Sequence, residues 1–244
     1  MRITQHNWFL QHAIKLVLAG ELVPAVFQRP YAWSKQDVLA LFESILRGYP
    51  IGSFLLWTPR DKQAFGTLAR TRLGPIVYSE EPDWSYVLLD GQNRLASLAW
   101  LLAGQDAPYP SDITGLEADT WQKDETLVVD LIERKLCFVP IGEQYGGLRV
   151  PASFIFDSVR MGKCIRSRWS FDWSVFSEEV RDNAVEWLEK GVIDQFRNAQ
   201  VTVTHLEKAS AVEAKDAFLH ICKVGLPMSE AAFDAAIAWT PPST

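Results

Sequence analysis

Apolar residues recur along this chain with two different periods, and the period distinguishes helices from strands. A spacing of three and four residues predicts a helix over residues 5–19, which ends near Gly20. A second helix is expected after Ser34, because Ser34 and Asp37 have the spacing of a capping box. The apolar face of this second helix consists of Val38, Leu41, Phe42 and Ile45.

Short apolar runs and alternating segments predict the strands. We expect strands over residues 53–57, 86–90 and 200–206, and a hairpin over residues 126–140. Residues 23–33 are expected to be extended, because a helix cannot run through Pro24 and Pro30. Residues 60–84 are expected to form a hairpin or a loop, and residues 105–124 a loop.

Further helices are expected directly after residue 90 and over residues 177–190, 211–223 and 229–238. This mixture of elements predicts an α+β fold, with a small mixed sheet flanked by helices. We expect residues 1–244 to form a single domain, with the last helix able to begin a following helical region.

The composition is that of a globular protein. The chain has 244 residues, and 48% of them are hydrophobic, which is enough for a sizeable core. There are 24 lysine and arginine residues against 30 aspartate and glutamate residues, so the formal net charge is −6. Such a chain as a whole is a poor sequence-independent binder of nucleic acid, although a local basic patch can still bind it.

Neither a targeting segment nor a disulfide framework or zinc site is indicated. The N-terminus lacks the apolar run of a signal peptide, and no run approaches the roughly 18 residues of a membrane helix. Cys137, Cys164 and Cys222 are odd in number and far apart, and the four histidines lack a metal-ligand spacing. We therefore expect a soluble cytoplasmic protein with reduced thiols.

Candidate chemistry lies at a seam between a strand and a helix, in the sequence Asp90-Gly91-Gln92-Asn93-Arg94. A helix that begins directly after a strand presents backbone N–H groups and the positive end of its dipole, which favour phosphate. Gly91 lets the backbone approach a ligand, and Arg94 can fork onto phosphate oxygens. Asp90 can hold Mg²⁺ or orient a water, and the two amides can hydrogen-bond ribose, a base edge or that water.

The seam also allows a purely structural interpretation. Asp-Gly is a common turn, Asp90 can cap the helix, and Arg94 can be a solvated surface residue. A second segment favours chemistry, because Gln28-Arg29 sits in a rigid stretch next to Pro30. An edge strand would explain the neighbouring aromatic residues well, but the Gln-Arg pair less well.

A basic run is the candidate for nucleic-acid contact. Basic residues followed by aromatic residues can bind phosphates and stack on bases. The simpler interpretation, which we favour, is a solvated basic loop leading into a packed aromatic cluster. The basic residues are Arg160, Lys163, Arg166 and Arg168, and the aromatic residues behind them are Trp169, Phe171 and Trp173.

Three motifs together resemble those of a known family. They are P-x-x-F-Q-R-P-Y-x-W over residues 24–33, G-Y-P-I-G-S over 48–53 and L-L-D-G-Q-N-R-L over 88–95. A fourth element, AFLHICKVGLPMS over 217–229, matches more loosely. The motifs resemble the ParB/sulfiredoxin-like N-terminal domain of GmrSD-type modification-dependent restriction proteins and related phage-defence proteins, over about residues 10–238.

The resemblance implies binding and hydrolysis of a nucleoside triphosphate, coupled to DNA cleavage by another domain or a partner protein. With the seam chemistry, it leads to our first hypothesis, a nucleoside triphosphatase that uses Mg²⁺. The catalytic residues would be Asp90, Gln92 and Arg94, with Asp90 on the metal. The nucleotide-binding residues would be Gln28, Arg29, Gly91, Asn93 and Arg94.

Departures from the family pattern keep other hypotheses open. Asn93 replaces a usual Gln, His220 a usual Arg and Cys222 a usual Asn. Weakened turnover would leave a nucleotide or DNA sensor that regulates a partner nuclease. A third hypothesis is DNA binding by the basic run without a nucleotide, which predicts a strong dependence of affinity on salt.

Two related chemistries fit the residues poorly. Sulfiredoxin-like enzymes place a catalytic cysteine between the Gly and the Arg, where this chain has Gln92 and Asn93. ParB-type CTP switches carry G-x-R-R, and here Arg94 stands alone. The sequence also lacks a Walker A motif and an H-N-H nuclease cluster, so we expect any nuclease centre on another domain or protein.

Overall fold

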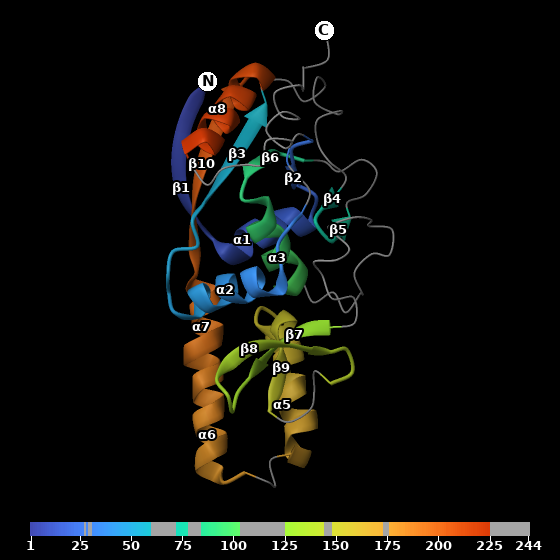
Figure 1. Ribbon diagram of the computed structural model, residues 1–244. Helices are drawn as coiled ribbons and strands as arrows, with labels where there is room; N and C mark the ends of the chain where they lie inside the picture. Colours follow the sequence, from blue (N-terminus) through green and yellow to red (C-terminus); the bar gives the residue numbers. More distant parts are fainter. Residues whose placement is uncertain are drawn as a thin grey trace.

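The computed structural model of the protein describes residues 1–26, 28, 31–59, 72–77, 84–102, 125–143, 148–172 and 176–224 (Figure 1). In residues 167–172 and 221–224, only the backbone is described.

A five-stranded mixed sheet forms the upper part of the molecule in Figure 1. The pairs β10–β3 and β2–β6 are parallel, whereas β1–β10 and β3–β6 are antiparallel. The predicted α+β class, with a small mixed sheet flanked by helices, is confirmed. In order across the sheet, the strands are β1 (Arg2–Phe9), β10 (Gln200–Ala209), β3 (Ser53–Pro59), β6 (Tyr86–Asp90) and β2 (Leu22–Pro24).

Four described helices accompany this sheet. The second of them, α2 (Lys35–Leu46), begins with the predicted capping box. The side chain of Ser34 accepts a hydrogen bond from the N–H of Asp37, and that of Asp37 accepts one from the N–H of Ser34. All four residues of the predicted apolar face of this helix are buried. The helices are α1 (Leu10–Leu18), α2 (Lys35–Leu46), α3 (Gln92–Leu102) and α8 (Ala211–Val224).

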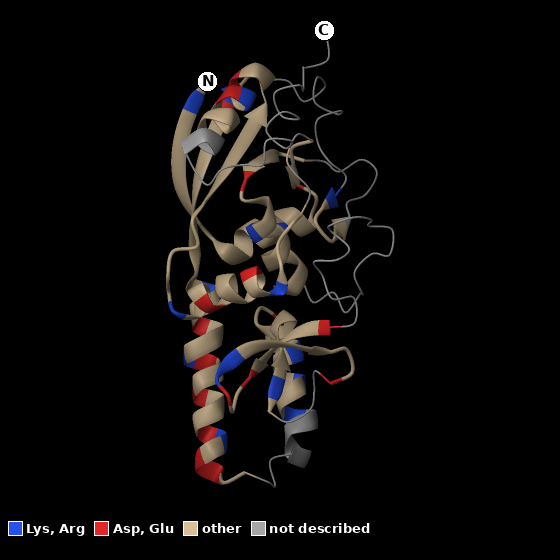
Figure 2. Ribbon diagram, in the orientation of Figure 1, with Lys and Arg blue, Asp and Glu red and all other residues tan. Residues whose placement is uncertain are grey.

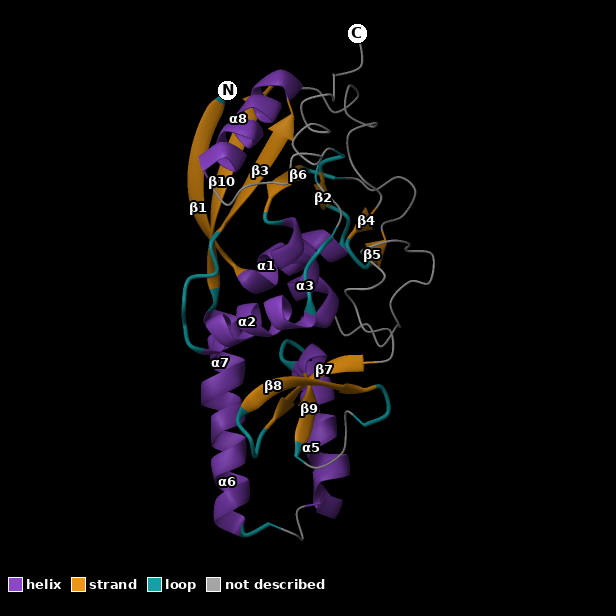
Figure 3. Cartoon of the chain, in the orientation of Figure 1, coloured by secondary structure: helices purple, strands orange, loops and turns teal. Residues whose placement is uncertain are grey.

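The lower part of the molecule combines a three-stranded antiparallel sheet with long helices (Figure 3). The predicted hairpin appears as β7 (Glu125–Asp130) and β8 (Lys135–Pro140), and β9 (Arg149–Pro151) pairs with β7. One helix is α5 (Ser158–Asp172). The other begins after its predicted cap, Ser177, and runs on as α6 (Glu178–Glu186), a π-helical stretch (Trp187–Ile193) and α7 (Asp194–Asn198).

Residues of both parts join one cluster of buried side chains, which includes Leu56 and Leu95 from the upper part and Val129 and Leu188 from the lower part.

Between residues 60 and 84, the described residues form a short hairpin of β4 (Arg72–Leu73) and β5 (Ile76–Val77). Among the described helices, none combines the length and apolar character that crossing a bilayer requires.

Two local predictions were wrong. Residues 5–9 belong to strand β1 and not to the first helix, because they pair with β10 along its length. The basic run that we interpreted as a loop is helix α5. Asp157 caps its start by accepting hydrogen bonds from the N–H groups of Val159 and Arg160, at 3.0 and 2.9 Å, and Met161 and Cys164 on its inner side are buried.

A group of rings on the sheet places a histidine in a partly buried position. His205 on β10 packs edge-on against Tyr86, with 5.4 Å between ring centres, and Tyr86 packs in the same way against Trp8. The Nε2 atom of His205 lies 2.7 Å from Oγ1 of Thr58. Burial lowers the pKa of His205, while the neighbouring Glu207 carboxylate opposes this effect.

The lowered pKa of His205 predicts a fold that is less stable in mild acid. The unfolded chain takes up a proton near the ordinary value of 6.5, above the pKa of the folded state, so the unfolded state binds more protons in this window. We expect the free energy of unfolding to fall as the pH decreases below about 6.5, and to fall less in His205→Asn. Urea unfolding at about pH 7.5 and about pH 5.5 measures the free energy of unfolding of both proteins.

The control is His220→Asn, which replaces an exposed histidine. An unaltered pH dependence in His205→Asn would contradict the prediction.

Candidate functional site

The seam between β6 and α3, residues 90–94, turns at Gly91. Its φ angle is +98°, a conformation that residues with a Cβ rarely adopt. A Cβ at this position would lie 2.4 Å from Cδ1 of Phe54 on β3, so the backbone passes close over that ring. Helix α3 begins at once, and the N–H of Leu95 donates to the Gly91 carbonyl at 3.0 Å. The strand, turn and helix predicted here are therefore confirmed.

Arg94 is held in place by several neighbours. Its Nη1 donates to the Ile51 carbonyl at 2.7 Å, and its Nη2 donates to Oδ2 of Asp90 at 3.3 Å. Its guanidinium carbon lies 5.5 Å from the centre of the Phe54 ring, and 21% of the side chain is exposed. Burial lowers the pKa of Arg94, and the Asp90 carboxylate opposes this effect. Since an arginine stays protonated in proteins, the seam carries a fixed, partly buried positive charge.

The loop after α2 provides the other half of this arrangement. Gly52 has a φ of +85°, and a Cβ there would lie 2.2 Å from Nη1 of Arg94, so only glycine permits the observed approach. Gly48, with a φ of +69°, ends α2 and starts the loop. Reasoning from the sequence missed this contact, although the two glycines of G-Y-P-I-G-S were a signal that the backbone bends tightly here.

The amides of the two motifs are buried. Gln28 is 5% exposed, and its Nε2 donates to the Leu88 carbonyl on β6 at 2.6 Å. Asn93 is 8% exposed, and its Oδ1 accepts a hydrogen bond from the N–H of Ala32 at 3.3 Å. Gln92 is equally buried in the first turn of α3. Gln28 is thus joined to β6 and Ala32 to α3.

A second polar contact fastens the same segment to α3. Tyr31 is fully buried, and its hydroxyl lies 2.8 Å from the hydroxyl of Ser97. Ser97 also donates a hydrogen bond to the Asn93 carbonyl at 2.8 Å. Residues 31 and 32 are therefore joined to α3 through both Asn93 and Ser97, and no pattern in the sequence indicated this second link.

Asp90 is the acidic side chain of the seam, and 45% of it is exposed. In the described ranges, no group of three or more His, Cys, Asp and Glu side chains is arranged to hold a metal ion. Mg²⁺ can be bound by one carboxylate when nucleotide phosphates and water supply its other ligands. Asp90 would hold the ion in this way.

The predicted nucleic-acid residues lie on α5, in the lower part of the molecule, whereas the seam lies in the upper part (Figures 1 and 2). Arg160, Lys163 and Arg166 are exposed, opposite the buried Met161 and Cys164. A spacing of three residues keeps these basic side chains on one side of the helix. The structure therefore separates the basic stripe from the candidate phosphate site.

Several predicted features lie outside the described residues. They are Arg29, Trp173, the loop over residues 105–124, the last helix over residues 229–238, and the side chains of Arg168, Trp169, Phe171 and Cys222. His220, another of the three departures from the family pattern, is exposed on α8.

Substituting Gly52 is expected to displace Arg94. The new methyl group of Gly52→Ala would overlap Nη1, so the guanidinium has to move and loses its bond to the Ile51 carbonyl. We expect a loss of about 2–3 kcal/mol in the free energy of unfolding, measured in urea. The control is Gly142→Ala, which has a φ of +105° and no described atom within 4 Å of the added Cβ. Equal costs for the two variants would show that Arg94 does not need this close approach.

Comparison with known proteins identifies the same family that the sequence motifs resemble. The family model described as GmrSD restriction endonuclease, N-terminal domain, matches residues 12–222, which is most of the chain. A protein of Methanocaldococcus jannaschii, the uncharacterized protein MJ0686, is 30% identical over 112 residues. That match covers 44% of this chain and 19% of the archaeal protein, so the chain corresponds to a small part of this relative.

Proposed function

This chain belongs to the family of GmrSD restriction endonuclease N-terminal domains, components of restriction and phage-defence systems, and on that premise we propose that its β6–α3 seam binds and hydrolyses a nucleoside triphosphate with Mg²⁺. DNA cleavage would be carried out by another domain or by a partner protein. The alternative is a sensor, which binds the nucleotide at the same seam without hydrolysing it and regulates that nuclease.

The observation that carries this proposal is the fixed guanidinium of Arg94 in the first turn of α3. Two of its five N–H groups bind Ile51 and Asp90, which fixes the plane in which the other donors lie. The backbone N–H groups at the start of α3 and the helix dipole add positive potential at the same place. A phosphate group is the ligand that this set of donors favours most.

The proposed reaction requires little covalent participation by the protein. Water attacks the terminal phosphorus, the bond to the bridging oxygen breaks, and a nucleoside diphosphate and inorganic phosphate leave. Arg94 neutralises charge on the phosphate oxygens, and the exposed carboxylate of Asp90 orients the attacking water. A bound Mg²⁺ would supply further charge neutralisation. Gln28 and Asn93 would act by holding the Gln-Arg segment against the seam.

Direct DNA contact would use a different surface. The exposed stripe of Arg160, Lys163 and Arg166 on α5 offers side chains for phosphate contacts. A net charge of −6 works against DNA binding by the rest of the chain, so this contact would be confined to the stripe. Its affinity would decrease steeply with salt and would not depend on Arg94.

The test is phosphate release from ATP, GTP, CTP and UTP with Mg²⁺, together with calorimetric binding. Wild type is compared with Asp90→Ala and Arg94→Ala. The matched controls are Glu43→Ala and Arg47→Ala, which break an exposed ion pair of the same i,i+4 spacing at the C-terminal end of α2. Circular dichroism shows which variants are folded.

Turnover that is lost in both seam variants and kept in both controls would establish the triphosphatase. Binding without turnover, abolished by Arg94→Ala, would establish the sensor. If folded wild-type protein neither binds nor hydrolyses any of the four nucleotides, the seam is structural and the proposal is wrong.

A further inference from the structure

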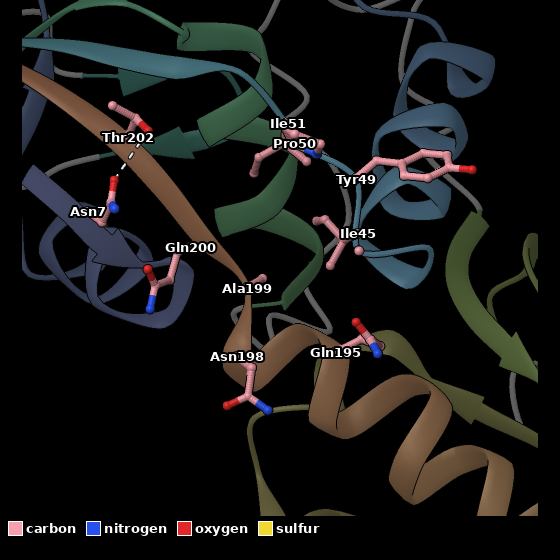
Figure 4. A pocket seen from close by; sticks show the side chains of 11 residues that line it. Asn7, Ile45, Tyr49, Pro50, Ile51, Gln195, Asn198, Ala199, Gln200 and Thr202 are labelled. Atoms are coloured by element: carbon pink, nitrogen blue, oxygen red, sulfur yellow. Dashed lines mark hydrogen bonds between the residues drawn. The ribbon is translucent and has the colours of Figure 1, made fainter.

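A pocket of about 440 Å³ lies beside the loop that holds Arg94 (Figure 4). The loop residues Gly48 to Ile51 form one side of it. The end of α7, the beginning of β10 and Asn7 on β1 form the rest. Of the described residues that line it, none belongs to the seam, so it is a separate cavity. Its volume is within the range of about 300–1,000 Å³ that is typical of small-ligand sites.

The polar lining of this pocket is entirely neutral among the described residues. It carries four side-chain amides and the hydroxyls of Tyr49 and Thr202, and no lysine, arginine, histidine, aspartate or glutamate. Oγ1 of Thr202 donates a hydrogen bond to Oδ1 of Asn7 at 3.2 Å (Figure 4). Each amide has N–H donors and an acceptor oxygen with two lone pairs, so the four amides can match a ligand that has donors and acceptors on one edge. We call this cavity the amide pocket; its polar side chains are Asn7, Tyr49, Gln195, Asn198, Gln200 and Thr202.

The position of the amide pocket in the fold disfavours an anion. The long helix that starts at α6 ends here at Asn198, and the C-terminal end of a helix carries negative potential and exposed carbonyl groups. Arg197 lies in the last turn of this helix but not in the lining, so a phosphate or carboxylate would find no cationic partner in the pocket itself. A neutral ligand with N–H donors would instead be attracted.

The opposite side of the pocket is apolar. Figure 4 shows Ile45, Pro50 and Ile51 grouped on one side and the amides of Asn7 and Gln200 on the other. A planar ring can lie against the apolar side while its edge meets the amides. Asn and Gln side chains are the usual readers of a base edge, because their two polar atoms match adjacent donor and acceptor atoms.

We infer that the amide pocket binds a neutral nucleobase, a purine or pyrimidine presented by a nucleoside or by a single-stranded nucleic acid. The inference rests on the pocket alone and does not depend on nucleotide hydrolysis at the seam. It has a consequence for the seam, however. Ile51 lines the pocket while its carbonyl accepts the hydrogen bond from Arg94, so a bound base contacts the loop that fixes the guanidinium.

The experiment uses nucleosides, which lack phosphate and therefore test the pocket independently of the seam. Adenosine, guanosine, cytidine and uridine are titrated into the ¹⁵N-labelled protein, and the side-chain amide signals are followed by NMR. We expect at least one nucleoside to shift the signals of Gln195, Asn198 and Gln200. The double variant Asn198→Ala/Gln200→Ala should bind that nucleoside at least ten-fold more weakly.

The control is Asn183→Ala, which removes an exposed amide of α6 outside the pocket and should leave the affinity unchanged. All three replaced side chains are exposed, so the variants should fold.

A tetranucleotide of the preferred base distinguishes a single-stranded nucleic acid from a free nucleoside as the ligand. Tighter binding of the oligonucleotide with the same shifts would indicate a nucleic acid, and loss of these shifts would indicate a free nucleoside.

Two results would overturn the inference. One is the absence of shifts in the pocket amides with all four nucleosides at millimolar concentration. The other is binding by the double variant as tight as by wild type. Because no phosphate is involved, either result would leave the proposed function of the seam intact.

Discussion

Replacing Arg94 with lysine is expected to weaken nucleotide binding by roughly 30- to 150-fold, although the positive charge is kept. The guanidinium donates through two different nitrogens, to the Ile51 carbonyl and to Asp90, and so presents its remaining donors in a fixed plane. A lysine ammonium is a single point that cannot make both contacts and still meet a phosphate. The loss corresponds to about 2–3 kcal/mol, the value of a charge-assisted hydrogen bond. Calorimetric titration with the nucleotide preferred by wild type measures it.

The matched control is Arg47→Lys, an exposed arginine directly after α2 that pairs with Glu43 and also hydrogen-bonds Tyr49. Because an exposed ion pair contributes little, this variant should bind like wild type. Urea unfolding separates the two roles of Arg94, since loss of the loop contact lowers stability with or without a ligand. If Arg94→Lys is less stable but binds with wild-type affinity, then Arg94 only holds the loop and does not contact phosphate.

Elements specified by short-range chemistry were predictable from the sequence. The capping box of Ser34 and Asp37 depends on residues three apart, and it marks the start of α2 in the structure. The hairpin of β7 and β8 is likewise local, since its strands are joined by a short turn. The strand, glycine and helix at residues 86–102 follow from an apolar run, a break and a leucine stripe.

Elements specified by distant partners were not predictable. Strand β1 pairs with β10, about 200 residues away, and its residues 5–9 also fit a helical spacing. Only the partner strand decides between the two conformations. Helix α5 was hidden by its charge, because Met161 and Cys164 supply a narrow apolar side and Asp157 supplies a cap that is easily overlooked.

The candidate site shows the same division. The residue types at the seam were evident from the sequence, whereas the direction of each side chain was not. Gln28 and Asn93 have the chemistry of ligand contacts, yet their side chains bind the backbone of Leu88 and Ala32. The amide pocket was invisible for another reason. Its four amides come from distant parts of the chain, at residue 7 and at residues 195–200, and no local pattern joins them.

Gly91→Ala is expected to be the most destabilising single substitution at the seam, with a loss of about 3–5 kcal/mol in the free energy of unfolding. A new Cβ would lie 2.4 Å from Cδ1 and 2.9 Å from Cε1 of Phe54, and the φ of +98° adds backbone strain. At Gly52 the obstacle is the end of a flexible side chain, but the Phe54 ring is 1% exposed and cannot move freely. Urea unfolding measures the loss.

Two comparisons separate the causes of that loss. Gly142→Ala, with a φ of +105° and no described atom within 4 Å of the added Cβ, isolates the backbone strain at about 1–2 kcal/mol. In the background of Phe54→Ala, the steric part of the Gly91→Ala cost should disappear, so the two substitutions together cost less than the sum of their separate effects. Strict additivity would mean that the ring does not restrict residue 91. Gly91 would then be needed only for the positive φ of the turn. Its close contact with Phe54 on β3 would not help to position the first turn of α3, which carries Arg94.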